Sequence, residues 1–334
     1  MNNTKKSIIY IACPANTETG GPEALHTLAF EIKNLGLNVY MYYYGTISNQ
    51  DPVRPKYKRF AVPYITEIDD NRNNILIIPE TNTKIQHDYK NITKAIWWLS
   101  VDNYIKVLNT KNYKGFKKLF RKIFPKKDLR IVNFKDKNLH HFAQSYYAIN
   151  FLKEKGAKNI YFLADYLSEE FISDKEIMNK YSKKDIVLYN PKKGYEFTQK
   201  LIEKAGNDIE FIPLINLTCA QVKDLCQQSK VYIDFGNHPG KDRFPRESAL
   251  CGNIIITNLQ GSAKFQKDVP LPQGYKFEDN DENINLIISK IKDCLENYDE
   301  KIKEFEAYRQ FIYKDKENFI NDIKNIFTHP KPIQ

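Results

Sequence analysis

The chain has 334 residues, of which 42% are hydrophobic and 13% aromatic, and its formal net charge is +10 at pH 7. This composition supports sizeable buried cores and excludes disordered and collagen-like chains. No apolar run approaches the roughly 18 residues that a membrane-spanning helix needs. The five cysteines form no metal-binding spacing, which is typical of a reduced, cytoplasmic protein.

Short apolar runs alternate with helical patterns along the first half of the chain. Strands are expected at 7–13, 37–44, 74–78, 95–101 and 159–163, with helices from 22 to 36 and from 140 to 155. A second series of strands follows at 186–189, 209–212, 230–235 and 253–257, with helices between them, one of which begins near 247. A helical tail covers 283–327. This alternation predicts two Rossmann-like halves with parallel, doubly wound sheets.

The positive charge is concentrated in the window 106–138, which holds twelve Lys or Arg and two Asp, so that the rest of the chain is neutral. Apolar residues recur there at the spacing of one helical face, with cations opposite. Such a helix is typical of one lying on an anionic membrane surface, although a core-docked helix with a charged outer face has the same pattern. The expected membrane contacts are Phe116, Lys117, Lys118, Leu119, Phe120, Arg121, Lys122, Ile123 and Phe124.

Two loops carry the features of anion sites. Gly20 and Gly21 follow the first strand and precede a helix, so their backbone N–H groups can approach a phosphate. The stretch 234–247 follows a later strand and holds His238 and three cations before a helix. Cations, a helix N-terminus and the carboxyl end of a parallel strand together favour an anionic ligand. Glu247, at the helix start, is suited to accept hydrogen bonds from ribose hydroxyls.

The order Val-Tyr-Ile-Asp-Phe-Gly, a polar loop and Pro-Arg-Glu-Ser-Ala-Leu-Cys-Gly resembles the donor half of GT-B glycosyltransferases. The Gly-Gly loop resembles their N-terminal half, so the resemblance covers nearly the whole chain. It is nearest to retaining enzymes of bacterial capsule and lipopolysaccharide clusters. It implies an α/β fold with two Rossmann-like domains facing across a cleft. The implied domains are 1–172 on the acceptor side, with 106–138 as a basic insertion, 173–304 for the nucleotide-sugar, and 305–334 as a helix returning to the first domain.

The resemblance also implies site residues. Glu247 matches the second glutamate of the retaining E-x7-E pattern, but the first falls on Pro239, which leaves the retaining or inverting outcome open. Lys192 or Lys193 matches the phosphate-binding lysine, and Arg243 the matching arginine. The implied donor-binding residues are Gly20, Gly21, Lys192, Lys193, His238, Lys241, Arg243, Arg246, Glu247, Gly261 and Ser262. For an inverting reaction, the candidate bases are Asp102, Glu23 and His26.

We therefore expect a metal-independent glycosyltransferase without a cofactor, in which the nucleotide-sugar is a substrate. Its expected acceptor is a membrane-associated glycan or lipid-linked glycan at the inner face of the cell membrane, and no nucleic-acid partner is expected. Two alternatives stay open. His238-Pro239 with the nearby cations suggests a transferase of CMP-activated acidic sugars, and the basic window also fits a non-catalytic nucleotide-binding or nucleic-acid-binding module.

Overall fold

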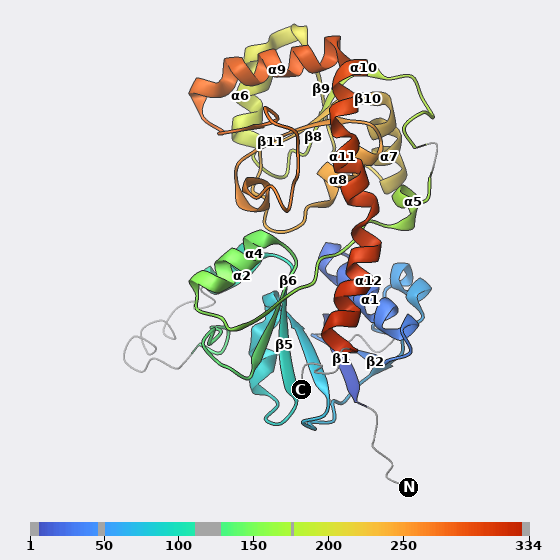
Figure 1. The fold of residues 1–334 in the computed structure, drawn as a ribbon, viewed down its shortest axis with the longest axis vertical. Coiled ribbons are helices and arrows are strands. Elements are labelled where there is room, and N and C mark those ends of the chain that lie inside the picture. The colour runs from blue at the N-terminus through green and yellow to red at the C-terminus, as the bar shows by residue number, and fades with distance from the viewer. Residues whose placement is uncertain (1–6, 46–50, 111–127, 175–176, 329–334) are drawn as a thin grey trace. The chain divides into compact units, whose positions relative to one another are not determined.

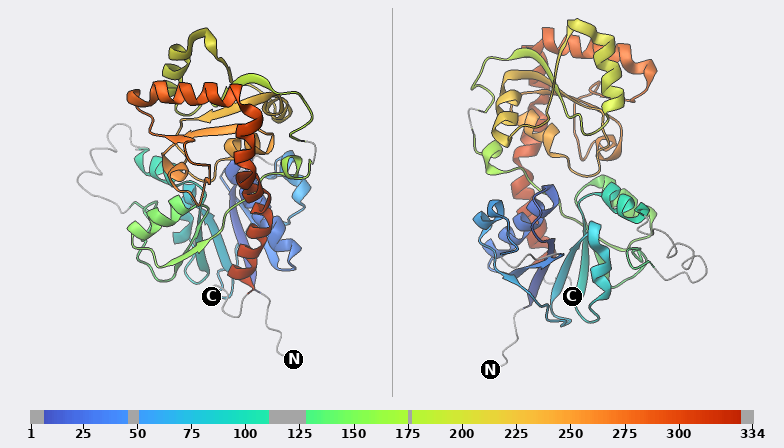
Figure 2. Two further views of the ribbon diagram at one scale, coloured as in Figure 1. Left: turned by 45° about the horizontal axis from the view of Figure 1, so that its top comes forward. Right: turned by 180° about the vertical axis from the view of Figure 1, so that it is seen from behind.

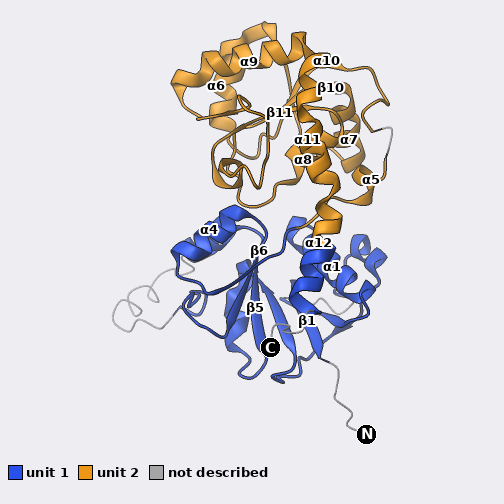
Figure 3. Ribbon diagram, viewed as in Figure 1, with its two compact units in different colours: residues 1–164, 320–334 blue, residues 165–319 orange. Residues whose placement is uncertain are grey.

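The computed structural model describes residues 7–45, 51–110, 128–174 and 177–328. The chain forms two compact units, shown in Figure 3: unit 1 is Met1–Ala164 with Ile320–Gln334, and unit 2 is Asp165–Phe319. The expected membrane-contact segment 116–124 lies outside the described residues. None of the helices in the described part of the chain is long and apolar enough to cross a membrane.

Unit 1 is built on a seven-stranded parallel sheet with the strand order β3-β2-β1-β4-β5-β6-β7 (Figure 1). The Ile-rich β1 and β4 lie in its interior and are almost wholly buried, as expected of strands covered on both faces. The strands are β1 Ile8–Pro14, β2 Asn38–Tyr44, β3 Tyr64–Ile65, β4 Ile75–Pro79, β5 Thr93–Trp98, β6 Leu139–Ala143 and β7 Asn159–Phe162.

The helices of unit 1 follow the carboxyl ends of its strands. They are α1 Gly20–Asn34, η1 Pro55–Phe60, η2 Glu80–His87, α2 Val101–Asn109 and α4 Tyr146–Glu154. Ser100 and Ser145 begin α2 and α4 as N-caps, because their hydroxyls accept the backbone N–H groups of Asn103 and Ala148. The start of α1 and the start of α2 are therefore at the carboxyl edge of the sheet.

Unit 2 contains a five-stranded parallel sheet with the order β12-β11-β10-β8-β9. The strands are β8 Lys184–Tyr189, β9 Glu210–Pro213, β10 Ser229–Asp234, β11 Ile254–Asn258 and β12 Lys276–Phe277. The chain passes from β8 to β9 on one side and then to β10 on the other side of β8. The carboxyl ends of β8 and β10 therefore form a topological switch point, where such sheets bind ligands.

In unit 2, α6 packs against α9 (Figure 2), and α8 packs against both α7 and α11. Their bounds are α5 Glu169–Ile172, α6 Tyr195–Ala205, α7 Cys219–Gln228, α8 Arg243–Leu250, α9 Ile284–Glu296, α10 Tyr298–Lys301 and α11 Glu306–Tyr313. Phe305, Tyr308 and Ile312 are buried in the core of this unit. Unit 2 therefore extends to Phe319, past the expected end at 304, and the following helix α12, Asp315–Phe327, leads into unit 1.

The parallel α/β architecture is confirmed, but two local predictions are wrong. His140 and His141, expected at a helix start, lie in the buried strand β6, because the apolar Leu139, Phe142 and Ala143 pair with β5 instead. Helix α8 begins at Arg243 and not near 247, since Pro245 is compatible with the first turn of a helix.

Candidate functional site

The loops after β8 and β10 touch at the switch point of unit 2. Gly194 has φ of +60°, and a Cβ added there would lie 2.1 Å from the backbone oxygen of Phe235. A Cβ on Gly236 would lie 2.4 Å from the Cβ of Lys193. Only glycines allow this approach, which brings residue 193 next to the polar stretch that follows β10.

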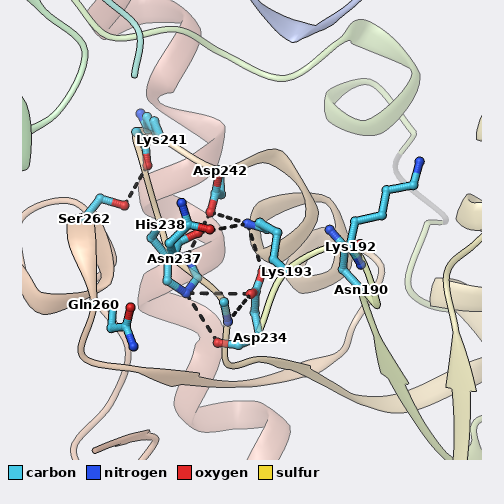
Figure 4. Close-up of polar contacts among 12 residues, drawn as sticks. Asn190, Lys192, Lys193, Asp234, Asn237, His238, Lys241, Asp242, Gln260 and Ser262 are labelled. Carbon is cyan, nitrogen blue, oxygen red and sulfur yellow. Dashed lines mark hydrogen bonds and ion pairs between the residues drawn. The ribbon is translucent and has the colours of Figure 1, made fainter. Parts of the chain in front are cut away.

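Lys193, Asp234, His238 and Asp242 form a group at this point, the Lys193 cluster (Figure 4). Asp234 and His238 are buried, and Lys193 and Asp242 are partly buried. Lys193 Nζ lies 2.7 Å from Asp242 Oδ2 and 3.6 Å from Asp234 Oδ2. His238 Nδ1 lies 2.9 Å from Asp242 Oδ2, and its Nε2 lies 3.8 Å from Asp234 Oδ1. Lys192 is exposed, and its side chain points away from the cluster. Of the two predicted lysines, Lys193 is the one that lies in the cluster.

The carboxylates favour the charged form of both bases of the cluster. Burial lowers the pKa of Lys193, but Asp234 and Asp242 outweigh it, so that the net shift is upward. Burial likewise opposes the charge on His238, and the same two carboxylates raise its pKa overall. Burial raises the pKa of Asp242, but His238 and Lys193 more than reverse this and lower it. The opposite charges nearby thus outweigh the cost of burial for Lys193, His238 and Asp242.

The cluster also contains a potential set of metal ligands. Within the described residues, Asp234, His238 and Asp242 are the one group whose ligand atoms lie close enough, within 4.8 Å of one another, to hold an ion. Lys193 Nζ already contacts both carboxylates of this set. The lysine ammonium therefore lies against two of the three candidate ligands.

The loop after β11 closes over the same stretch. Gly261 begins the short helix η4, Gly261–Lys264, with φ of +51°, and a Cβ there would lie 2.0 Å from the His238 carbonyl oxygen. The Ser262 backbone N–H donates to that oxygen at 2.8 Å, and the Ser262 hydroxyl donates to the Gly240 carbonyl at 2.6 Å. Gly261, Ser262 and His238, three of the predicted donor-binding residues, thus lie side by side.

The other cations of the predicted anion site are paired with acids. Arg243 Nε donates to Glu247 Oε1 at 3.1 Å, one turn along α8, and Glu247 is buried. Arg246 and Lys241 are buried against Asp165 and Asp315. The charges of Arg246 and Lys241 are thus compensated inside unit 2, which the sequence pattern did not indicate.

The predicted glycines of unit 1 lie at the start of α1. A Cβ on Gly20 would meet nothing within 4 Å, and one on Gly21 would reach only the side chain of Leu99, at 4.0 Å. The N-cap residue, Thr19, makes no side-chain cap hydrogen bond. The space around this helix start is open within the unit, so packing alone does not require the two glycines.

Two of the three candidate bases lie on α1 and are held by neighbours. Glu23 makes ion pairs with Lys56 at 2.9 Å and with Arg59 at 3.0 Å. His26 is buried, with Nδ1 2.7 Å from the Pro22 carbonyl and Nε2 2.8 Å from the Tyr43 hydroxyl. Nδ1 therefore carries the proton and Nε2 accepts, and burial lowers the pKa of His26.

Asp102 lies in the first turn of α2, at the carboxyl edge of the same sheet. It is partly exposed and accepts a hydrogen bond from the Tyr147 hydroxyl at 2.9 Å. Asp102 thus follows the strand β5, as expected from the sequence.

One buried acid at this edge was not predicted. Glu80, directly after β4, is 2% exposed, and its carboxylate accepts the Leu99 backbone N–H at 3.2 Å. Burial raises the pKa of Glu80 to about 8. The signal in the sequence was a single glutamate directly after the apolar run Ile75–Pro79, where the strand ends.

A groove of about 930 Å³ lies in unit 1 at the amino ends of β5 and β6. Thr93, Lys94 and Leu139 are among the residues that line it. The candidate bases follow the carboxyl ends of strands, so this groove belongs to the opposite edge of the sheet. It has no part in the candidate site.

No protein-family model matches the chain, and no curated protein matches it in sequence. Solved structures do match it. A sucrose-phosphate synthase from Thermosynechococcus elongatus has a TM-score of 0.63 at 11% identity, over 96% of this chain and 98% of that one. A glycosyltransferase from Rickettsia africae has a TM-score of 0.61 at 14% identity, over 97% and 100%. Anabaena HepE in complex with UDP-glucose has a TM-score of 0.60 at 11% identity, over 95% and 98%.

At these identities the likeness is one of fold, and it extends over nearly the full length of each chain. It agrees with the two parallel sheets and their crossover helices. The predicted fold is thereby confirmed, and the chain has the GT-B fold, which these glycosyltransferases share.

Proposed function

We propose that the protein is a glycosyltransferase that uses a nucleoside-diphosphate sugar as its donor. The observation that carries the proposal is the Lys193 cluster, in which an ammonium group lies against two carboxylates at the switch point of the parallel sheet of unit 2. The HepE structure contains UDP-glucose, which supports a UDP-sugar as the first donor to test.

In this proposal, Lys193 binds the diphosphate and Glu247 binds the ribose, with Gly261 and Ser262 beside them. During transfer, the bond between the anomeric carbon and the phosphate oxygen breaks, and the carbon bonds to the acceptor oxygen. The electron pair stays on the diphosphate, so negative charge develops there. A preorganised ammonium next to the phosphate stabilises that charge.

We infer that this chemistry does not need a metal ion. The support is that Lys193 Nζ contacts the two carboxylates that would otherwise form the metal site. For the acceptor proton, Asp102 is the best candidate base. It is partly exposed, whereas Glu23 and His26 are buried.

We also propose a membrane-associated glycan as acceptor, at the inner face of the membrane. The support is the concentration of charge and apolar residues at 116–124 in the sequence. Flotation with anionic and neutral vesicles tests this: replacing Lys117, Lys118, Arg121 and Lys122 by Gln should abolish binding to the anionic vesicles. Retained binding would contradict the assignment.

The proposed function is tested by incubating the protein with UDP-, GDP-, dTDP- and CMP-sugars and measuring release of the nucleotide. Lys193→Met should reduce turnover at least a hundredfold, because the leaving diphosphate loses its cation. Lys200→Met is the matched control, since this exposed lysine on α6 pairs with Asp281. Equal turnover of the two variants would refute the role of Lys193, and turnover of only the CMP-sugar would favour the alternative donor class.

A further inference from the structure

Arg246 belongs to a buried charge network that the proposed donor contacts do not use. Its side chain is 2% exposed, with Nη2 2.8 Å from Asp165 Oδ1 and Nη1 3.2 Å from Asp315 Oδ2. The other oxygen of Asp315 lies 2.5 Å from Lys241 Nζ. Two cations and two carboxylates therefore compensate each other away from water, as buried charges require.

The same guanidinium group also makes hydrogen bonds to the backbone of the loop between β10 and α8. Its Nε donates to the Asp242 carbonyl at 3.1 Å, and Nη2 donates to the Lys241 carbonyl at 2.9 Å. Asp242 in turn holds Lys193 through its carboxylate at 2.7 Å. A continuous chain of short contacts thus runs from Arg246 to the lysine of the Lys193 cluster.

The two acids of the network have a particular place in the chain. Asp165 is the first residue of unit 2, and Asp315 begins α12, the helix through which the chain leaves that unit. Arg246 therefore fastens the loop to both the entering and the leaving segment. A planar guanidinium with five donors can bridge these acceptors at once, whereas a lysine in its place cannot.

We propose that Arg246 is a positioning residue for the donor site. It fixes the backbone at residues 241 and 242 and, through Asp242, the position of Lys193, without touching the donor. This inference rests on the proposed function, and it replaces the direct donor contacts expected of Arg246 and Lys241 in the sequence.

The test uses Arg246→Lys in the full chain and measures the dissociation constant for UDP by calorimetry. UDP affinity should fall about tenfold, and amide hydrogen exchange at 238–242 should become faster. In a Lys193→Met background, Arg246→Lys should cause no further loss, because the group that it positions is gone. Lys316→Gln is the control, since its exposed ion pair with Glu169 joins α12 to α5 in the same unit and should leave both readouts unchanged.

Additive losses of affinity in the double variant would overturn the proposal, as would an unchanged affinity and exchange rate in Arg246→Lys. Should that variant fail to fold, Asp165→Asn removes one charge at nearly constant shape, and unchanged readouts there also overturn it. A wild-type protein that binds no UDP contradicts the proposed donor, whereas the exchange rates at 238–242 still decide the role of Arg246.

Discussion

Replacing Gly261 with alanine tests whether the loop after β11 must lie against His238. Gly36 is the control: it closes α1 with a left-handed φ of +75°, but a Cβ there would meet nothing within 4 Å. A Cβ on Gly261 would lie 2.0 Å from the His238 carbonyl oxygen. The pair therefore separates backbone strain, which both variants share, from steric overlap, which only Gly261→Ala suffers.

The magnitudes follow from these two contributions. Left-handed backbone costs alanine about 1–2 kcal/mol, which both variants lose. Overlap at Gly261 adds about 1–3 kcal/mol, and loss of the Ser262 hydrogen bond to His238 adds about 0.5–1.5 kcal/mol. At about 2–4 °C per kcal/mol, the melting temperature of Gly261→Ala should therefore lie well below that of Gly36→Ala.

Thermal unfolding and UDP titration of both variants provide the measurement. Gly261→Ala should also lose UDP affinity, because the displaced loop lies beside the Lys193 cluster, whereas Gly36→Ala should retain it. Equal melting temperatures, or an unchanged UDP affinity in Gly261→Ala, would refute the close packing of this loop.

Two further predictions concern charge. Because burial raises the pKa of Glu80 from 4.5 to about 8, its proton is held more tightly in the folded chain, and stability should fall as pH rises between these values. Glu80→Gln cannot ionise, so its free energy of unfolding in urea should rise relative to that of the wild type by up to roughly 5 kcal/mol as the pH increases to 8. A difference between the two proteins that stays constant across pH would contradict this. EDTA should leave donor turnover unchanged, since Lys193 supplies the charge at Asp234 and Asp242; loss of turnover restored by added Mn²⁺ would assign these acids to a metal.

The strands and crossover helices could be predicted because their signals are local. Runs such as Ile75–Pro79 are short and apolar, and helices follow them with regular spacing. Strand β6 was missed because two histidines interrupt its apolar character, although both are buried between neighbouring strands. Residues 139–143 form a strand because they pair with β5, and this pairing cannot be recognised from the local sequence.

The candidate site was predictable only in part, for a similar reason. The cations near Glu247 stand out in the sequence, but the acids that neutralise Arg246 are 81 and 69 residues away. Asp234 and Asp242 were part of the predicted stretch, yet their contact with Lys193 depends on the glycine-mediated approach of two loops. Which cations belong to the Lys193 cluster and which, like Arg246, stabilise the fold thus depends on ion pairs between residues far apart in the sequence.

Unit 1 is discontinuous in sequence, and this affects how the protein is made. Its last contribution is the end of α12, where Ile323, Ile326 and Phe327 are buried and Phe327 packs edge-to-face on Phe142 at 5.9 Å. During synthesis, the seven strands emerge from the ribosome long before this helix. Until the whole of unit 2 has been translated, the sheet lacks this helix, and the apolar surface that the helix covers is exposed. Binding of a chaperone to that surface would protect the nascent chain from aggregation during this interval.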